Sequence, residues 1–275
     1  MTLPGLSISE WRVTRDTIHK CAVLNGKIRA ALAPAEKHWW HISLRVAADG
    51  LTTTPMPAES QNVEILMDFR QHAQVLSTSN GKNICIPFTG QSINELYRST
   101  KDALVSIGID PELDDSLFAD ESEGNYDSPA VERYWRAMVT VDEVFKRFRD
   151  TLPGETSPVQ VFPHHFDLSL NWFYGGLVPG ADPEDEENSA EQMGFGFVTG
   201  DEEIDDAYFY VTAFPTPGSW VECKLSPAAI WHTGAWTGAV LNFDALITMA
   251  DPAEALYRFL KSTHAAAVPL MNINE

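Results

Sequence analysis

Two imidazoles and two indoles stand together near the start of the chain, as His38-Trp39-Trp40-His41. The alternation of polar and apolar residues that follows predicts a strand over residues 39–46. On such a strand His38 and His41 point to opposite faces and do not chelate one metal ion. The rings then either pack in a core, with one histidine bonded to a buried backbone group, or line a binding site.

A second segment, at residues 164–170, offers polar residues in similar places, and its alternation predicts a strand over residues 162–172. If the two segments are copies of one unit, their polar stripes meet at a pseudo-twofold axis and form one patch. The residues that this hypothesis places in a binding patch are Trp39, His41, Ser43, Arg45, His165, Asp167 and Glu191.

Within this patch His41 and Asp167 are the candidate catalytic residues, because an imidazole beside a carboxylate serves general acid–base chemistry. Ser43 or Ser169 would extend the pair to a nucleophilic relay, and a further histidine or glutamate would make half of a metal site. The chain contains no Gly-x-Ser-x-Gly elbow, no His-Glu-x-x-His helix and no glycine-rich phosphate loop. We expect no metal and no cofactor, and the sequence leaves open whether the protein is an enzyme.

The elements that must position these residues follow one plan in the first half of the chain. Ser7 and Glu10 have the spacing of a capping box and predict a helix that ends near Pro34. Ser92 and Glu95 open a second helix in the same way, and Asn80-Gly81 predicts a hairpin. The expected strands between the helices are residues 39–46, 63–69, 74–78 and 84–88.

The same order of helix, four strands and helix is expected again after an acidic connector at residues 110–127. Ser128 and Pro129 begin a long amphipathic helix, and a last helix covers residues 251–266. The expected strands between them are residues 162–172, 194–198, 208–214 and 239–243. The sequence predicts an α+β protein of two similar halves, 1–109 and 128–275, each with an antiparallel sheet and helices packed on one face.

The charge composition of the chain argues against two classes of binding partner. Lys plus Arg number 19 against 39 for Asp plus Glu, a net charge of −20, which opposes binding to nucleic acid and to anionic membranes. Residues 1–5 lack the basic start of a secretory signal, and three scattered cysteines do not make a disulfide framework. We expect a cytoplasmic protein.

Aromatic residues are the least ordinary part of the composition, with 8 Trp, 7 Tyr and 14 Phe. Several strands carry rings at successive positions and therefore on both faces, while helices cover only one face. Large apolar patches rarely stay in water, so most of these rings pack in a core, and the others are covered by a loop, a small-molecule ligand, a protein partner or a second copy of the chain.

Five motifs occur together in a fixed order: His38-Trp39-Trp40-His41, Gly50-Leu51-Thr52-Thr53, Tyr134-Trp135-Arg136-Ala137, Ser157-Pro158-Val159 and Phe166-Asp167-Leu168. In this combination the chain resembles a bacterial family of uncharacterised proteins, domain of unknown function 5996, from Trp11 to about Ala267. The resemblance implies no activity. The family pattern often has a His-Glu pair where this chain has Ala190-Glu191, so a role of that histidine does not carry over.

The sequence therefore predicts an uncharacterised binding or interaction module for a small molecule or a protein. The alternative is an acid–base enzyme, for example a hydrolase, that uses His41 and Asp167.

Overall fold

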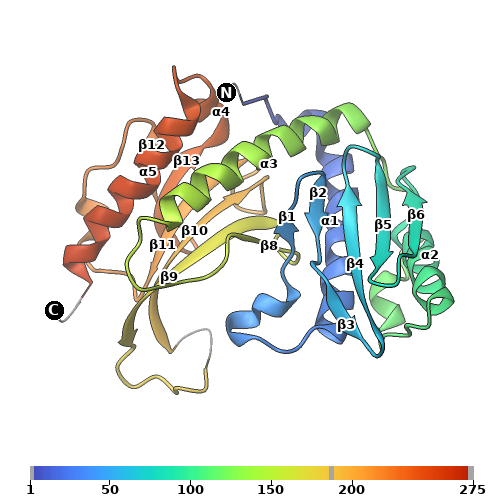
Figure 1. Ribbon diagram of the computed structural model, residues 1–275. Helices are drawn as coiled ribbons and strands as arrows, with labels where there is room; N and C mark the ends of the chain where they lie inside the picture. The colour runs from blue at the N-terminus through green and yellow to red at the C-terminus, as the bar shows by residue number, and fades with distance from the viewer. Residues whose placement is uncertain (1–2, 186–188, 272–275) are drawn as a thin grey trace. The chain divides into compact units, whose positions relative to one another are not determined.

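The computed structural model describes residues 3–185 and 189–271 (Figure 1). The chain forms two compact units, which we call unit 1 (Met1–Ile8, Arg136–Gln160 and Asp167–Glu275) and unit 2 (Ser9–Trp135 and Val161–Phe166). Helices accompany two antiparallel sheets, of six and seven strands, which confirms the α+β class. The sequence-based division into 1–109 and 128–275 describes an expected repeat and stays a prediction.

Unit 2 is built on the six-stranded sheet, whose strands follow the order β1-β2-β4-β5-β6 with β3 paired to β4. The Asn80-Gly81 turn joins β5 to β6, as the hairpin prediction required. The strands are β1 (Arg45–Val46), β2 (Gly50–Thr52), β3 (Met56–Ala58), β4 (Gln61–Asp68), β5 (Ala73–Thr78) and β6 (Asn83–Pro87).

Two helices, α1 (Ile8–Leu32) and α2 (Ile93–Ser106), accompany this sheet, with α1 behind the strands in Figure 1. The capping box is confirmed at α2, where Ser92 Oγ accepts from Glu95 N at 3.1 Å and Glu95 Oε2 accepts from Ser92 N at 3.2 Å. Gln74 Nε2 of β5 donates to Thr100 Oγ1 of α2 at 2.7 Å, so this buried amide donor is satisfied inside the apolar core.

Unit 1 contains the seven-stranded sheet, with the strand order β12-β13-β11-β10-β9-β7. Its strands are β7 (Glu155–Thr156), β9 (Asp167–Leu177), β10 (Ala190–Val198), β11 (Tyr208–Phe214), β12 (Ala229–Thr233) and β13 (Thr237–Asn242), and β8 (Gln160–Phe162) lies where the chain passes between units. The helices are α3 (Ser128–Arg149), which is shared between the units, α4 (Phe243–Ile247) and α5 (Pro252–Ala267). Short 3-10 turns are η1 (Lys37–Ile42), η2 (Asp115–Phe118), η3 (Trp220–Glu222) and η4 (Val268–Leu270).

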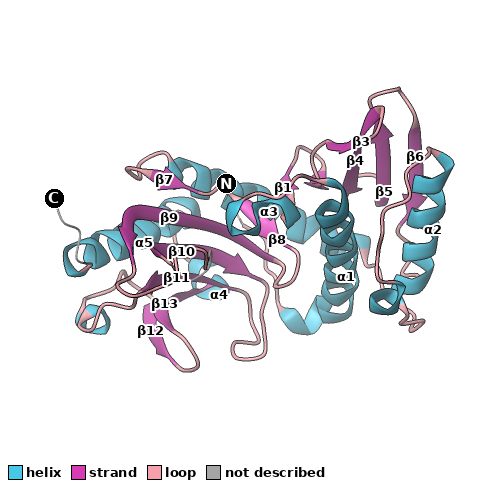
Figure 2. Ribbon diagram, turned by 90° about the horizontal axis from the view of Figure 1, so that it is seen from below, coloured by secondary structure: helices cyan, strands magenta, loops and turns pink. Residues whose placement is uncertain are grey.

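The core of unit 1 lies between its sheet and the two helices α3 and α5 (Figure 2). Phe148 of α3 meets Phe195 of β10 edge to face, with ring centroids 4.8 Å apart. His264 of α5 meets Trp172 of β9 at 4.5 Å, and its Nε2 has no hydrogen-bond partner among the described residues. Burial among these rings lowers the pKa of His264 to about 4.

This histidine makes unit 1 sensitive to acid. The unfolded chain binds the proton below about pH 6.5, whereas folded His264 binds it only near pH 4, so stability falls as pH drops through that window. Because the ring is only partly buried, we expect a loss of about 1–2 kcal/mol rather than the full value of the shift. His264→Phe should remove this loss, as measured by urea unfolding at pH 7 and pH 4.5.

The matched control for this experiment is His38→Asn, which changes a histidine of unit 2 at a position whose φ of 53° asparagine tolerates. It should leave the acid-dependent loss of stability as it is in the unchanged protein. An equal loss in His264→Phe and in the unchanged protein would contradict the assignment.

The prediction of a strand over residues 39–46 is wrong. Residues 37–42 form the turn η1, in which His38 and Trp39 have φ of 53° and 59°, and only Arg45 and Val46 remain extended as β1. Side chains take the backbone groups that a strand ladder would need: the Arg29 guanidinium donates to the carbonyls of Trp40 and Ser43. Alternating hydrophobicity carries no information about such hydrogen bonds from side chains to the backbone. The pattern therefore predicted a longer strand than the one that forms.

The second expected strand, over residues 162–172, is interrupted. β8 ends at Phe162, Phe166 has a φ of 54°, and β9 begins only at Asp167. His165 therefore lies in a turn and not on a strand.

Six and seven strands replace the four that were expected in each half. In both sheets consecutive strands are neighbours, as β4-β5-β6 in unit 2 and β9-β10-β11 in unit 1. An antiparallel meander of this kind is compatible with an internal duplication but is also common without one. The duplication stays a prediction.

Candidate functional site

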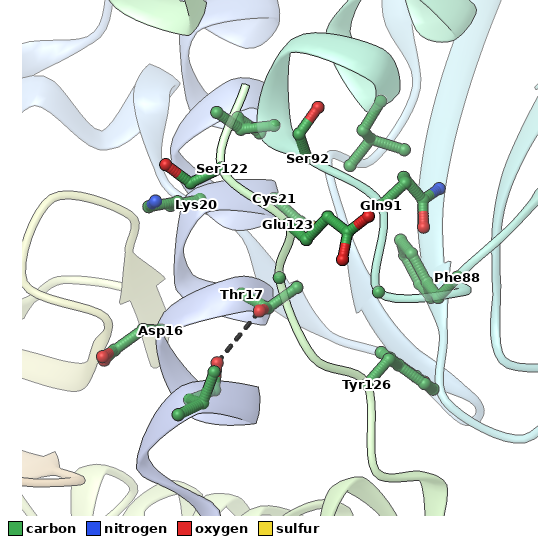
Figure 3. Close-up of a pocket in the computed structure, with 15 residues that line it drawn as sticks. Asp16, Thr17, Lys20, Cys21, Phe88, Gln91, Ser92, Ser122, Glu123 and Tyr126 are labelled. Atoms are coloured by element: carbon green, nitrogen blue, oxygen red, sulfur yellow. Dashed lines mark hydrogen bonds between the residues drawn. The ribbon is translucent and has the colours of Figure 1, made fainter. Parts of the chain in front are cut away.

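Unit 2 contains an open cavity of about 190 Å³ between α1, the start of α2 and the end of the acidic connector (Figure 3). We call it the α1–α2 cavity. Its walls include buried apolar side chains, among them Phe88, Ile93 and Leu96. Tyr126 adds a second ring, stacked on Phe88 with centroids 5.3 Å apart. The cavity therefore offers an apolar and partly aromatic surface to a small molecule.

The connector closes one side of this cavity. Thr17 Oγ1 of α1 accepts from Asn125 N at 3.0 Å, and Thr14 Oγ1 accepts from Asp127 N at 3.1 Å. Gly124 fits directly above Thr17, where a Cβ atom would come within 2.7 Å of Oγ1. The acidic side chains of the connector are mostly exposed, as expected, while its backbone is fixed to α1.

Three charged residues line the cavity, and two of them already have partners. Asp16 pairs with Arg15 at 2.8 Å and Lys20 pairs with Asp120 at 2.7 Å. Glu123 makes no ion pair in the part of the chain that the structure describes. In Figure 3 its side chain lies on the same side of α1 as Phe88 and Tyr126, whereas Asp16 and Lys20 extend to the other side.

The helix end at the cavity is also largely satisfied. Ser92 and Glu95 exchange hydrogen bonds in the capping box, and Asn94 N donates to the Asp120 carbonyl at 3.3 Å. The Glu95 carboxylate stands in the first turn, where it compensates the positive end of the helix dipole. A neighbouring hollow of about 240 Å³ shares Lys20 and Ile93 with the cavity but is more open and more apolar.

The residues predicted from the sequence lie elsewhere, and unit 2 holds five of them. Ser43 Oγ accepts from an Arg45 Nη1–H and donates to the Trp40 carbonyl at 2.7 Å. Burial, followed by the nearby charge of Arg29, lowers the pKa of Arg45 to about 10. This part of the predicted patch is a hydrogen-bonded cluster around Ser43 and two guanidinium groups.

Trp39 and His41 stack on each other in η1, with ring centroids 5.5 Å apart. His41 Nδ1 accepts from Glu36 N at 3.2 Å, so the neutral ring carries its proton on Nε2. Trp39 is 52% exposed, whereas His41 is buried. The curled backbone allows this i, i+2 stacking.

His165, the fifth predicted residue of unit 2, stands beside His164 in the turn after β8, with ring centroids 4.4 Å apart. Desolvation, and then the positive charges of His165 and His19, lowers the pKa of His164 to about 4. His19 Nε2 lies 2.8 Å from the Pro163 carbonyl and supports the turn. Among residues 3–185 and 189–271 no group of His, Cys, Asp or Glu is arranged to hold a metal ion.

Unit 1 holds the other two predicted residues. Asp167 is buried at the start of β9, where its Oδ2 accepts from Tyr210 Oη at 2.6 Å. Burial and the negative Asp167 raise the pKa of Tyr210 well above its ordinary value, so that Tyr210 stays a donor. The ring of Tyr210 crosses β10 above Gly196, the only residue type that leaves room for it there.

Glu191 lies at the other end of the β9–β10 ladder. The register places Ala190 opposite Leu177 and Phe197 opposite Leu168, so Glu191 and Asp167 are separated by most of the strand length, more than about 20 Å. Burial and the charge of Glu191 raise the pKa of the nearby Tyr174. The two acids do not form one site.

His41 belongs to unit 2 and Asp167 to unit 1, so their acid–base pairing stays a prediction. Sequence reasoning missed the cavity residues Phe88, Gln91, Glu123 and Tyr126. The capping box indicated that a helix begins at Ser92, but nothing in the linear sequence indicated that residues 122–126 pack against α1.

The fold and the cavity define an α+β protein with a small open pocket in one of its two units. Residues 3–275 match the family of unknown function DUF5996, and the chain belongs to that family. No curated protein and no solved structure matches it. None of the described helices is both long and apolar enough to cross a bilayer.

Proposed function

We propose that this protein binds a small molecule in the α1–α2 cavity. The observation that carries the proposal is the cavity itself: an open space of about 190 Å³ that is lined by apolar side chains and, in equal measure, by polar groups. In small-molecule sites apolar surface supplies affinity and polar groups fix the orientation of the ligand, and this cavity offers both.

The volume limits the size of the ligand. A cavity of about 150 Å³ holds benzene, and drug-sized ligands occupy at least about 300 Å³. The α1–α2 cavity lies between these values, so its ligand has about ten non-hydrogen atoms, or is a larger molecule that inserts one such group. We expect the dissociation constant of a ligand of this size to lie in the micromolar to millimolar range.

The proposal is tested with a library of small fragments followed by two-dimensional NMR of the whole protein. Fragments that bind should shift the backbone amide signals of Gln91, Ser92 and Tyr126, which surround the cavity. Val13→Phe places a larger side chain at the cavity edge and should weaken binding by at least about tenfold, since the added ring occupies part of a small space.

Val105→Phe is the matched control, because Val105 is 51% exposed and Val13 is 57% exposed, and Val105 does not line the cavity. It should leave fragment affinity unchanged. Equal affinities for both variants, or fragments that shift no cavity amide, would overturn the proposal.

A further inference from the structure

We infer that the ligand of the α1–α2 cavity is a small amphipathic cation, an ammonium group carried by an aromatic or aliphatic body. This inference rests on the proposed function and adds the chemical class of the ligand. The inference follows from the charged residues at the cavity, because all but one of them already have a partner of opposite charge among the residues that the structure describes.

The positive groups near the cavity are engaged by the protein itself. Lys20 Nζ lies 2.7 Å from Asp120 Oδ2, and this ion pair holds the connector on α1. The start of α2 has its capping box and the Glu95 carboxylate in its first turn. An anionic ligand would compete with both arrangements, and it would also approach a chain of net charge −20.

The negative charge of Glu123 has no such compensation. Of the charged residues that line the cavity, it alone lacks an ion-pair partner within the described parts of the chain. Glu123 is exposed to solvent, so leaving its carboxylate without an ion pair costs little. A ligand that covers it must either pair with it or remove its water at a cost.

The apolar wall fits the rest of such a ligand. Phe88 and Tyr126 form a stacked pair, and the Tyr126 hydroxyl is held 3.1 Å from His72 Nδ1, so the ring orientation is fixed. The face of an aromatic ring attracts an ammonium group as well as an apolar body. Glu123 from the connector and these two rings therefore present a carboxylate and aromatic surfaces to one cavity.

Three probes of similar size test the charge of the ligand: benzylamine, which is protonated at pH 7, neutral benzyl alcohol, and anionic benzoate. Affinities are measured by NMR titration of the whole protein at low salt. We expect benzylamine to bind about fivefold or more tightly than benzyl alcohol, and benzoate to bind weakest. Salt should reduce the preference for benzylamine and leave the alcohol unaffected.

Glu123→Gln keeps the size of the side chain and removes its charge. It should lower benzylamine affinity to that of benzyl alcohol and leave the alcohol itself unchanged. Glu121→Gln, at an exposed acid of the same connector that does not line the cavity, is the matched control and should leave the preference in place.

The outcomes separate the two proposals. If benzyl alcohol binds as tightly as benzylamine, and Val13→Phe weakens both, the cavity is a binding site but the cationic class is wrong. If Glu121→Gln and Glu123→Gln reduce benzylamine binding equally, the preference comes from overall charge and the role of Glu123 is overturned. If no probe shifts the cavity amides at millimolar concentration, both the ligand class and the proposed function lose their support.

Discussion

Gly50→Ala should destabilise unit 2 by about 3–4 kcal/mol, the largest effect we expect from a single methyl group in this protein. A Cβ atom at Gly50 would stand 1.7 Å from the Met67 carbonyl oxygen and 2.8 Å from its carbon. Both obstacles are backbone atoms of β4, which pairs with β2 at this point through Gly50 and Asp68. The two strands would have to separate, because no side-chain rotation relieves the contact.

Thermal unfolding followed by circular dichroism measures this loss, which corresponds to a fall of roughly 5–7 °C in Tm for a chain of this size. Gly218→Ala is the control, since a Cβ atom there meets nothing within 4 Å. It should change Tm by no more than about 2 °C. A Gly50→Ala variant as stable as Gly218→Ala would show that β2 and β4 do not approach this closely.

Gly196→Ala should destabilise unit 1 by about 2–3 kcal/mol by displacing Tyr210 from Asp167. An added Cβ atom would lie 2.1 Å from Cζ and 2.3 Å from the hydroxyl oxygen of Tyr210. The ring can move aside, but its hydroxyl then loses the 2.6 Å hydrogen bond to the Asp167 carboxylate. Hydrogen bonds to a charged group contribute about 1.5–3 kcal/mol, and a buried carboxylate that loses one is left partly uncompensated.

A double-mutant cycle with Tyr210→Phe separates this effect from simple crowding. In the Tyr210→Phe background the hydrogen bond is already absent, so Gly196→Ala should cost at least about 1.5 kcal/mol less than it does alone. Gly194→Ala is the matched control on the same face of β10, where a Cβ atom meets only the rotatable Thr212 Oγ1 at 2.8 Å and Asn171 Nδ2 at 3.9 Å. Strict additivity of the two changes in urea unfolding would refute the role assigned to Gly196.

The local elements of this fold were predictable from local signals. The Ser92–Glu95 spacing marked the start of α2, Asn80-Gly81 marked the β5–β6 hairpin, and the stripe after Ser128 marked α3. Each of these signals acts within a few residues along the chain, so the linear sequence contains both the donor and the acceptor, or the whole apolar face.

The segments at 39–44 and 163–166 were mispredicted for the opposite reason. Arg29, which lies on α1, supplies the hydrogen bonds that curl residues 40–43, and His19 of the same helix supports the turn at Pro163. Alternating hydrophobicity predicts a strand only where the backbone groups are free to pair with another strand. Here side chains of α1, distant in sequence, bond to backbone carbonyls of these segments instead.

The sequence by itself determined the α+β class, the membership in a family of unknown function and most of the helices, because these depend on periodicity and on residue order. Only the tertiary structure decided where a ligand could bind. Residues 13–21, 88–96 and 122–126 lie far apart in the chain, and the hydrogen bonds of Thr14 and Thr17 bring the connector against α1. A cavity is the space left between packed elements, and its position depends on contacts that span about a hundred residues of sequence.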